Sequence, residues 1–209
     1  MKEREDKHRI LILGASGFLG HAIYKELCSY FKTFGTYKTS NTQLEKNNHF
    51  FQYNIEEDDV YEILDIVKPT IIISSLRGDL AAQLVAHKHI AEYVFSRKIK
   101  FIFLSSANVF DAYSKYPSYE QDKTLSNSIY GHFKIKIENM LLRMPKNQVA
   151  IIKHPKAANK VPKTLTLGAL KFNAHEVNFD EMLSRLKAYK AKETKGYAEY
   201  LESLQVLSN

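Results

Sequence analysis

Residues 9–20 read RILILGASGFLG, and this stretch decides the fold of the chain. The apolar run at residues 10–13 is short and directly precedes a glycine, which is typical of a buried β-strand. Residues 21–31, HAIYKELCSYF, then show the periodicity of an amphipathic helix. A strand, a glycine-rich turn and a helix in this order predict the first unit of a phosphate-binding α/β domain.

The glycine-rich turn is the first candidate binding site. Glycine lets the backbone turn sharply and approach a pyrophosphate closely, and the start of the following helix offers N–H groups and a partial positive charge. The alternative is a tight strand–helix turn that binds no ligand. We expect the turn to bind the pyrophosphate of a dinucleotide through Gly14, Ser16, Gly17, Phe18, Leu19 and Gly20.

The same alternation of strands and helices continues along the chain. Further strands are predicted at residues 31–37, 49–55, 70–75, 100–106 and 148–153, and further helices at residues 58–68, 80–98 and 127–144. The run TIIISS at 70–75 lacks polar alternation, as expected of a strand covered on both faces. The sequence therefore predicts a Rossmann-type, doubly wound parallel α/β sheet with right-handed crossovers.

Composition limits the class of protein. The chain has 209 residues with 44% hydrophobic and 25% charged residues, which suits one globular domain. A single cysteine, Cys28, excludes an internal disulfide framework and fits a reducing compartment. The charged start, MKEREDKHR, and the short apolar run after it indicate no signal peptide and no membrane span. We expect a cytoplasmic protein.

The net charge of +7 raises the question of nucleic-acid binding. The basic residues are dispersed among acidic ones and form no arginine-rich block, so we expect a solvated basic surface and no nucleic-acid partner. Such a surface also suits a phosphorylated small substrate. His87 and His89 lie two apart on a predicted helix and point in different directions, and His154 and His175 lack a partner at ligand spacing, so no metal site is expected.

Cofactor choice depends on the end of the second strand. In NAD-selective sites an acidic side chain there binds the 2′-hydroxyl of the adenosine ribose. The corresponding stretch, GTYKTSN, contains no acid, and Lys38 lies about where that acid would be. Lys38 is therefore expected to face a 2′-phosphate, which favours NADP, with NAD as the alternative. The competing interpretation is a solvated lysine on a loop.

Three motifs in order, GASGFLG, FIFLSSANVF and YGHFK, resemble the extended short-chain dehydrogenase/reductase family. Within it the chain is most similar to dTDP-4-dehydrorhamnose reductases and related NAD-dependent nucleotide-sugar epimerases. The stretch FQYNIEEDDVYEILDIVKPTIIISS adds to this resemblance, which covers residues 9–153. It implies an NAD(P)-binding Rossmann domain over residues 1–153 and a nucleotide-sugar substrate, with a homodimer expected by analogy.

The resemblance also implies a catalytic triad of Ser106, Tyr130 and Lys134. The chain has two Tyr-x-x-x-Lys pairs, Tyr119/Lys123 and Tyr130/Lys134. Family members place the tyrosine about two dozen residues after the Ser/Thr that ends the fifth strand, and Tyr130 has this spacing from Ser106. Tyr130 and Lys134 also share one face of a helix. The alternative is a half-buried tyrosine, a solvated lysine and a serine that only ends a strand.

In the implied mechanism the tyrosine gives a proton to the ketone oxygen that receives negative charge. A neighbouring lysine ammonium is expected to lower the pKa of the Tyr130 phenol and to hold the nicotinamide ribose. Ser106 is expected to orient the same oxygen. Family dehydratases carry Asp-Glu where this chain has Ala107 and Asn108, which leaves reduction or epimerisation.

Further contacts are implied by position in the family. Asn54 and Ile55 are expected near the adenine, and Ser74 and Ser75 near the ribose and pyrophosphate. The family usually has Asp at the position of Asn54. Arg77 is expected either to meet a substrate phosphate or to lie on the surface.

The C-terminal segment departs from the family. Relatives continue with a substrate-binding subdomain, whereas residues 154–209 match none of it. Residues 178–207 predict one or two helices, so the segment is expected to be mainly helical and to replace that subdomain. Three functions stay open: a nucleotide-sugar keto reductase, an epimerase with the same triad, and a truncated dinucleotide-binding domain without activity.

Overall fold

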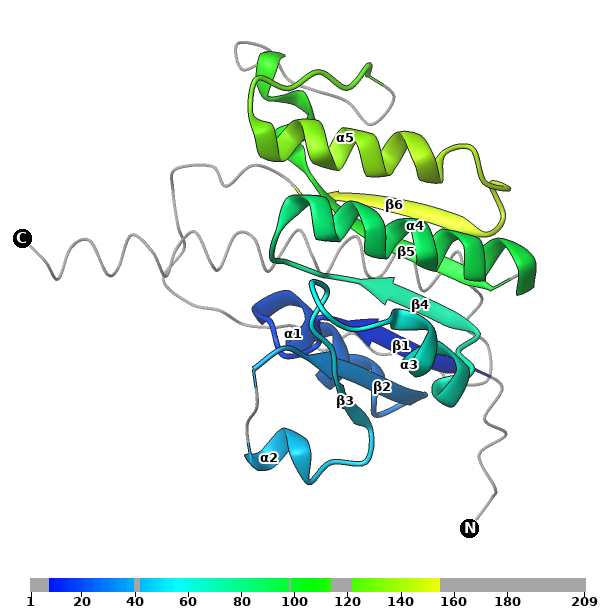
Figure 1. The fold of residues 1–209 in the computed structure, drawn as a ribbon. Coiled ribbons are helices and arrows are strands. Elements are labelled where there is room, and N and C mark those ends of the chain that lie inside the picture. The colour runs from blue at the N-terminus through cyan, green and yellow to red at the C-terminus, as the bar shows by residue number, and fades with distance from the viewer. Residues whose placement is uncertain (1–7, 40–41, 98, 114–121, 155–209) are drawn as a thin grey trace, which may run out of the picture.

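The computed structural model describes residues 8–39, 42–97, 99–113 and 122–154. Six parallel strands form one sheet in the order β3-β2-β1-β4-β5-β6 (Figure 1). The strands are β1 (Arg9–Leu13), β2 (Lys32–Tyr37), β3 (Phe50–Gln52), β4 (Ile71–Ser74), β5 (Lys100–Ser106) and β6 (Val149–His154). The helices are α1 (Phe18–Leu27), α2 (Thr42–Glu45), α3 (Val60–Val67), α4 (Leu80–Arg97), α5 (Ile129–Leu141) and a 3-10 helix, η1 (Ala107–Tyr113).

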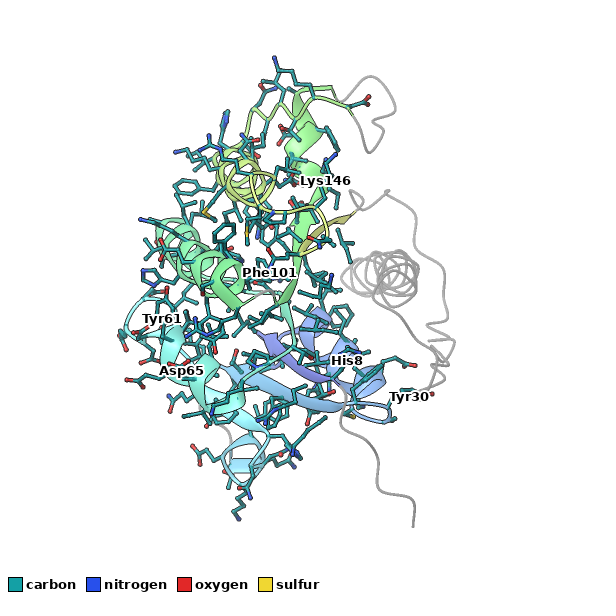
Figure 2. The ribbon with its side chains drawn as sticks, turned by 90° about the vertical axis from the view of Figure 1, so that its right-hand side faces the viewer. His8, Tyr30, Tyr61, Asp65, Phe101 and Lys146 are labelled. Atoms are coloured by element: carbon teal, nitrogen blue, oxygen red, sulfur yellow. The ribbon has the colours of Figure 1, made fainter. Side chains whose placement is uncertain are left out.

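Both faces of the sheet are covered. Helices α3, α4 and α5 lie on one side of it, with Phe101 buried beneath them (Figure 2). Helix α1 packs Ile23 and Leu27 against the opposite face. In β1, Ile10 and Ile12 pack on the α1 side of the sheet, whereas Leu11 and Leu13 pack on the other side. Successive side chains therefore enter different cores. This double burial explains the run of apolar residues without polar alternation.

The predicted fold class is confirmed: the chain forms a doubly wound parallel sheet with flanking helices. The third strand is shorter than the expected residues 49–55, because Asn54 opens a turn in which its carbonyl accepts from Glu57 N and Asp58 N at 3.1 and 2.8 Å. Helix α5 begins as predicted, since the Ser128 hydroxyl caps it by accepting from Gly131 N at 3.1 Å. The expected helices of residues 178–207 lie outside the described residues, as does all of 155–209.

Strand order also locates the candidate site. The chain winds from β1 outward to β3, then returns to β4 beside β1 and winds the other way to β6. In open α/β sheets, ligands bind outside the carboxyl ends of the strands at this switch in direction. The carboxyl ends of β1 and β4, which pair through Leu13 and Ser74, mark that place here.

Candidate functional site

A cleft of about 560 Å³ opens at the carboxyl ends of the central strands. It brings together most of the residues predicted from sequence. Those that line it are Gly14, Ser16, Gly17, Phe18, Leu19, Gly20, Lys38, Ile55, Ser75, Arg77, Ser106, Tyr130 and Lys134. Asn54 and Ser74 do not line it.

The glycine-rich turn forms one wall of the cleft and is held in place by its neighbours. Gly14 has a φ of +81°, which a residue with a side chain rarely adopts, and its N–H donates to Thr36 Oγ1 at 2.8 Å. A Cβ on Gly20 would lie 2.2 Å from the carbonyl oxygen of Gly14, so only glycine allows this approach of α1 to β1. Ser75 adds a clamp, since its Oγ donates to Leu13 O at 2.9 Å.

The opposite wall carries the predicted triad. Ser106 ends β5, while Tyr130 and Lys134 lie one turn apart on α5. Tyr130 is 40% exposed, and the nearby Ser106 hydroxyl acts to lower the pKa of its phenol. The Nζ of Lys134 lies 5.6 Å from the centre of the Tyr130 ring. The three side chains therefore meet in one place, across the cleft from the glycine turn.

Ser106 is oriented by the residue two positions later. Its Oγ accepts from Asn108 N and donates to Asn108 Oδ1, both at 3.2 Å. Asn108 also lines the cleft. Asn108 therefore holds the hydroxyl at the end of β5, a role beyond the absence of the dehydratase Asp-Glu pair noted from the sequence.

Lys134 is buried, with 3% of its surface exposed. Its Nζ donates to Gln83 Oε1 at 3.2 Å and lies 4.8 Å from the centre of the Phe103 ring. Burial lowers the pKa of Lys134 to about 8, and the positive charge of Arg77 contributes to this shift. The lysine is thus far easier to deprotonate than an ordinary surface lysine.

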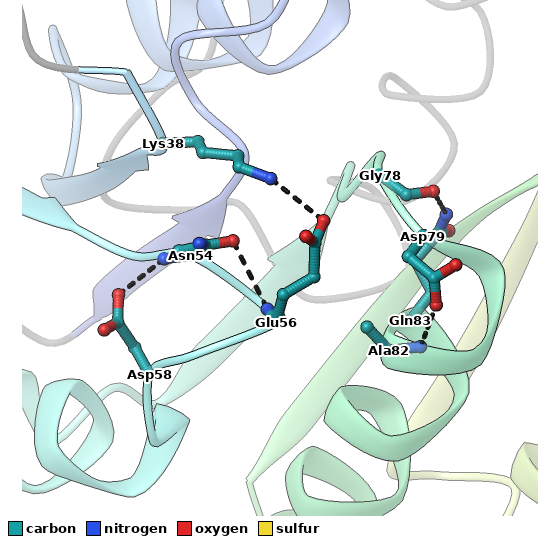
Figure 3. A network of polar contacts seen from close by, with 8 residues as sticks. All are labelled: Lys38, Asn54, Glu56, Asp58, Gly78, Asp79, Ala82 and Gln83. Carbon is teal, nitrogen blue, oxygen red and sulfur yellow. Dashed lines mark hydrogen bonds and ion pairs between the residues drawn. The ribbon is translucent and has the colours of Figure 1, made fainter.

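Gln83, on α4, contacts Lys134 and was not predicted from the sequence. Its Nε2 donates to Gly78 O at 2.9 Å, so the same amide joins Lys134 to the loop between β4 and α4 (Figure 3 shows the Gly78 contact). Its backbone carbonyl lies 2.5 Å from His87 Nδ1. Nothing in the local pattern around Gln83 distinguishes it from a surface glutamine, because the contact with Lys134 joins residues 51 positions apart.

His87 occupies the core behind Gln83. Its Nε2 lies 2.9 Å from Ser74 Oγ, and its ring meets the Phe103 ring edge-on at 4.8 Å. Burial lowers the pKa of His87, and the charge of Lys134 lowers it further, so the ring is neutral. Ser74 therefore serves this buried contact, at 1% exposure, and not the cleft where the sequence placed it.

The pKa of the Tyr130 phenol is shifted by groups other than the expected one. Burial raises the pKa of the Tyr130 phenol, while the Arg77 charge and the hydrogen bond with Ser106 act in the opposite direction. The cation that counters the rise is thus Arg77, whereas Lys134 was expected to lower this pKa. The reason is geometric: Lys134 points into the core toward Gln83 and Phe103.

The far end of the cleft holds an ion pair that was not predicted. Lys38 Nζ lies 2.9 Å from Glu56 Oε1, and both side chains are about half exposed (Figure 3). Asn54 supports the loop that carries Glu56: its Oδ1 accepts from Glu56 N at 3.3 Å and its own N–H donates to Asp58 Oδ2 at 2.6 Å. Asn54 therefore shapes the rim of the cleft from outside, while Ile55 reaches the cleft itself.

The described part of the chain has neither a metal-binding cluster nor a membrane-spanning helix. Among residues 8–39, 42–97, 99–113 and 122–154, no three His, Cys, Asp or Glu side chains cluster as a metal site. None of the helices described there is long and apolar enough to cross a bilayer.

The strand order, the glycine turn and the cleft together define a Rossmann-type domain of the extended short-chain dehydrogenase/reductase class. The chain belongs to the family described as RmlD substrate binding domain, which matches residues 8–156. No curated protein sequence matches it.

Solved structures share the fold at low sequence identity. A hypothetical dTDP-4-dehydrorhamnose reductase from Sulfolobus tokodaii is 19% identical, with a TM-score of 0.60 over 70% of this chain and 55% of that one. UDP-glucose 4-epimerase from Brucella ovis in complex with NAD is 15% identical, with a TM-score of 0.57 over 71% and 51%. dTDP-4-dehydrorhamnose reductase from Bacillus anthracis in complex with NADP is 19% identical, with a TM-score of 0.55 over 73% and 55%. The chain thus spans about half the length of these proteins.

Proposed function

We propose that this chain is an NAD(P)-dependent oxidoreductase that reduces a keto group of a nucleotide-sugar, with Ser106, Tyr130 and Lys134 as its catalytic residues. One observation carries the proposal: the three side chains line the same cleft as the glycine turn, at the switch point of the sheet. Membership of the RmlD substrate binding domain family supports the class of substrate.

The residues present fit a nicotinamide dinucleotide. Gly20 lets α1 approach β1 closely, because a Cβ there would overlap Gly14 O, and Gly17 at the start of α1 places no side chain over the helix end. A pyrophosphate there meets the partial positive charge of the helix. Ile55 lies on the side expected for the adenine, and Tyr130 and Lys134 on the side expected for the nicotinamide ribose.

The bound cofactor would supply the hydride that reduces the ketone carbon. Tyr130 then gives its phenolic proton to the ketone oxygen, which completes the alcohol. Ser106 would turn its single hydroxyl proton from Asn108 Oδ1 to the same oxygen and fix its position, while Asn108 N still donates to Ser106 Oγ. Arg77 is the cation that stabilises the phenolate left on Tyr130, while Lys134, whose Nζ lies 5.6 Å from the centre of the Tyr130 ring, is the group proposed to hold the nicotinamide ribose.

Two alternatives have support of their own. An epimerase would use the same three residues and return the hydride to the other face of the sugar, and the similarity to a UDP-glucose 4-epimerase favours keeping it. A dinucleotide-binding domain without activity is the second alternative, because the glycine turn and the cleft by themselves require only that a dinucleotide binds.

The deciding experiment follows NADPH and NADH absorbance with the purified chain and a 4-keto dTDP-sugar, beside an assay that interconverts UDP-glucose and UDP-galactose with catalytic NAD. Stoichiometric oxidation of the reduced cofactor with the keto sugar is the expected result. Interconversion without net oxidation would replace the reductase with the epimerase. Cofactor binding without either reaction would leave the inactive binding domain.

A further inference from the structure

The ion pair between Lys38 and Glu56 lies where the adenosine ribose is expected. Lys38 follows β2, the strand whose end carries the ribose-binding acid in NAD-selective sites, and it lines the cleft. Glu56 comes from the loop after β3, which brings an acid to this place from a different strand. Glu56 was not predicted from the sequence, because the acid was expected in the stretch after β2 and that stretch has none.

The carboxylate of Glu56 lies at the rim of the cleft, beside Lys38, which lines the cleft itself. Its Oε1 contacts Lys38 at 2.9 Å. The same oxygen lies near the loop between β4 and α4, since a Cβ built on Gly78 would be 3.6 Å from it (Figure 3 labels both residues). Gly78 itself has a φ of +130° and lines the cleft. Glu56 is thus held by Lys38 at the edge of the cleft, close to the loop that carries Gly78.

We propose that Glu56 is a specificity-determining residue that, paired with Lys38, selects against a phosphate on the 2′ position of the adenosine ribose. The inference rests on the proposed function, because it needs the cleft to bind a nicotinamide dinucleotide. It replaces the expectation that Lys38 by itself favours NADP.

The chemistry of the two cofactors separates them at this pair. A ribose hydroxyl both donates and accepts, so it donates to the Glu56 carboxylate while accepting from the Lys38 ammonium. A phosphate monoester has only acceptor oxygens when ionised and carries nearly two negative charges at neutral pH. The phosphate can bind the Lys38 ammonium only if that ammonium separates from Glu56. The phosphate then lies beside a carboxylate that has lost its cation.

The test measures dissociation constants of NADH and NADPH by fluorescence titration, for the wild type and three variants. Glu56→Gln removes the carboxylate and keeps the shape of the side chain. Glu57→Gln removes the same charge one residue away, on a side chain that does not contact Lys38 in the described structure, and serves as the matched control. Lys38→Met leaves Glu56 without its cation.

The wild type is expected to bind NADH at least as tightly as NADPH. Glu56→Gln should lower the dissociation constant of NADPH relative to that of NADH by about fivefold, which is the size of one partly exposed charge interaction. Added salt should reduce this change. Lys38→Met should raise the dissociation constant of NADPH more than that of NADH. Glu57→Gln should leave the ratio of the two dissociation constants unchanged.

Different results overturn different claims. A wild type that prefers NADPH at least tenfold, with the ratio unaltered by Glu56→Gln, would reject Glu56 as the selective residue while leaving the dinucleotide site intact. An equal effect of Glu57→Gln would show that the change in the ratio comes from net charge alone, and it would also reject Glu56 as the selective residue. Failure of every variant and of the wild type to bind either cofactor would overturn the proposed function itself, and this inference with it.

Discussion

Lys134 donates a hydrogen bond from its Nζ to Gln83 Oε1 at 3.2 Å, and both side chains are buried. Gln83 in turn donates to the carbonyl of Gly78 at the mouth of the cleft. This contact between α5 and α4 holds the Lys134 ammonium beside Tyr130. A buried ammonium is costly unless its protons are paired, so this contact stabilises the charged form of Lys134 in the fold.

Replacement of Gln83 by Leu should destabilise the fold by about 2 kcal/mol, because a buried donor and a backbone carbonyl both lose their partner. It should also lower the pKa of Lys134 below its present value near 8, since the charged form loses an acceptor. Urea unfolding at several pH values measures both effects.

The matched control for this change is Gln52→Leu, on an exposed residue of β3. It should leave the free energy of unfolding nearly unchanged. An equal loss in the two variants, or a pKa of Lys134 that does not move in Gln83→Leu, would remove Gln83 as the residue that positions the lysine.

Burial of Lys134 predicts an unusual dependence of stability on pH. The pKa falls from 10.5 to about 8 on folding, so the unfolded chain binds this proton more tightly between the two values. The penalty for burying the charge is full below pH 8 and is relieved as the pH rises, so the free energy of unfolding should gain about 2 kcal/mol by pH 9.5. Higher pH is avoided because tyrosines with raised pKa values, such as Tyr53, then oppose the trend.

Lys134→Met should abolish that rise, whereas Lys136→Met, on the exposed face of the same helix, should keep it. Urea unfolding at pH 7 and pH 9.5 compares the three proteins. A stability that stays flat in the wild type would show that Lys134 is not held as a buried ammonium.

The sequence was sufficient for the parts of the molecule set by local pattern. The apolar run at residues 10–13 and the glycine after it predicted β1 and its turn, because a strand buried on both faces needs such residues whatever surrounds it. Spacing along the helix likewise predicted that Tyr130 and Lys134 share a face.

The sequence was insufficient where a partner comes from elsewhere in the fold. Gln83 and Glu56 look like surface residues in their own stretches, and only the packing of α4 on α5 and of β3 beside β2 gives them their contacts. Ser74 was assigned to the cleft from its position at a strand end. It points instead to His87, because successive residues of a strand face opposite sides.

The glycine turn gives a prediction that separates two of its glycines. A Cβ at Gly20 would lie within 3 Å of Gly14 O, Ser75 Oγ and Ala15 Cα, whereas a Cβ at Gly17 meets Gly14 O at 3.3 Å. Gly20→Ala should cost about 3 kcal/mol through backbone overlap, and Gly17→Ala less than about 1 kcal/mol. Equal losses in urea unfolding would contradict this account of the packing of α1 on β1.

The proposed proton donor gives a prediction about turnover. Tyr130→Phe removes only the hydroxyl, so the rate with a 4-keto dTDP-sugar should fall by about 10²-fold or more while the dissociation constant for the reduced cofactor stays within about threefold. Tyr119→Phe, from the second Tyr-x-x-x-Lys pair, is the control and should retain the rate. A retained rate in Tyr130→Phe would assign proton donation to another group.

The claim on which the account depends is that the cleft between the glycine turn and α5 binds a nicotinamide dinucleotide. Fluorescence titration of NADH and NADPH with the purified chain tests it most directly, with ADP-ribose added as a competitor. We predict saturable binding of at least one reduced cofactor, reversed by ADP-ribose because both share the pyrophosphate held by the glycine turn. If neither NADH nor NADPH binds at millimolar concentration to the folded chain, the cleft is not a dinucleotide site and the proposed function is wrong.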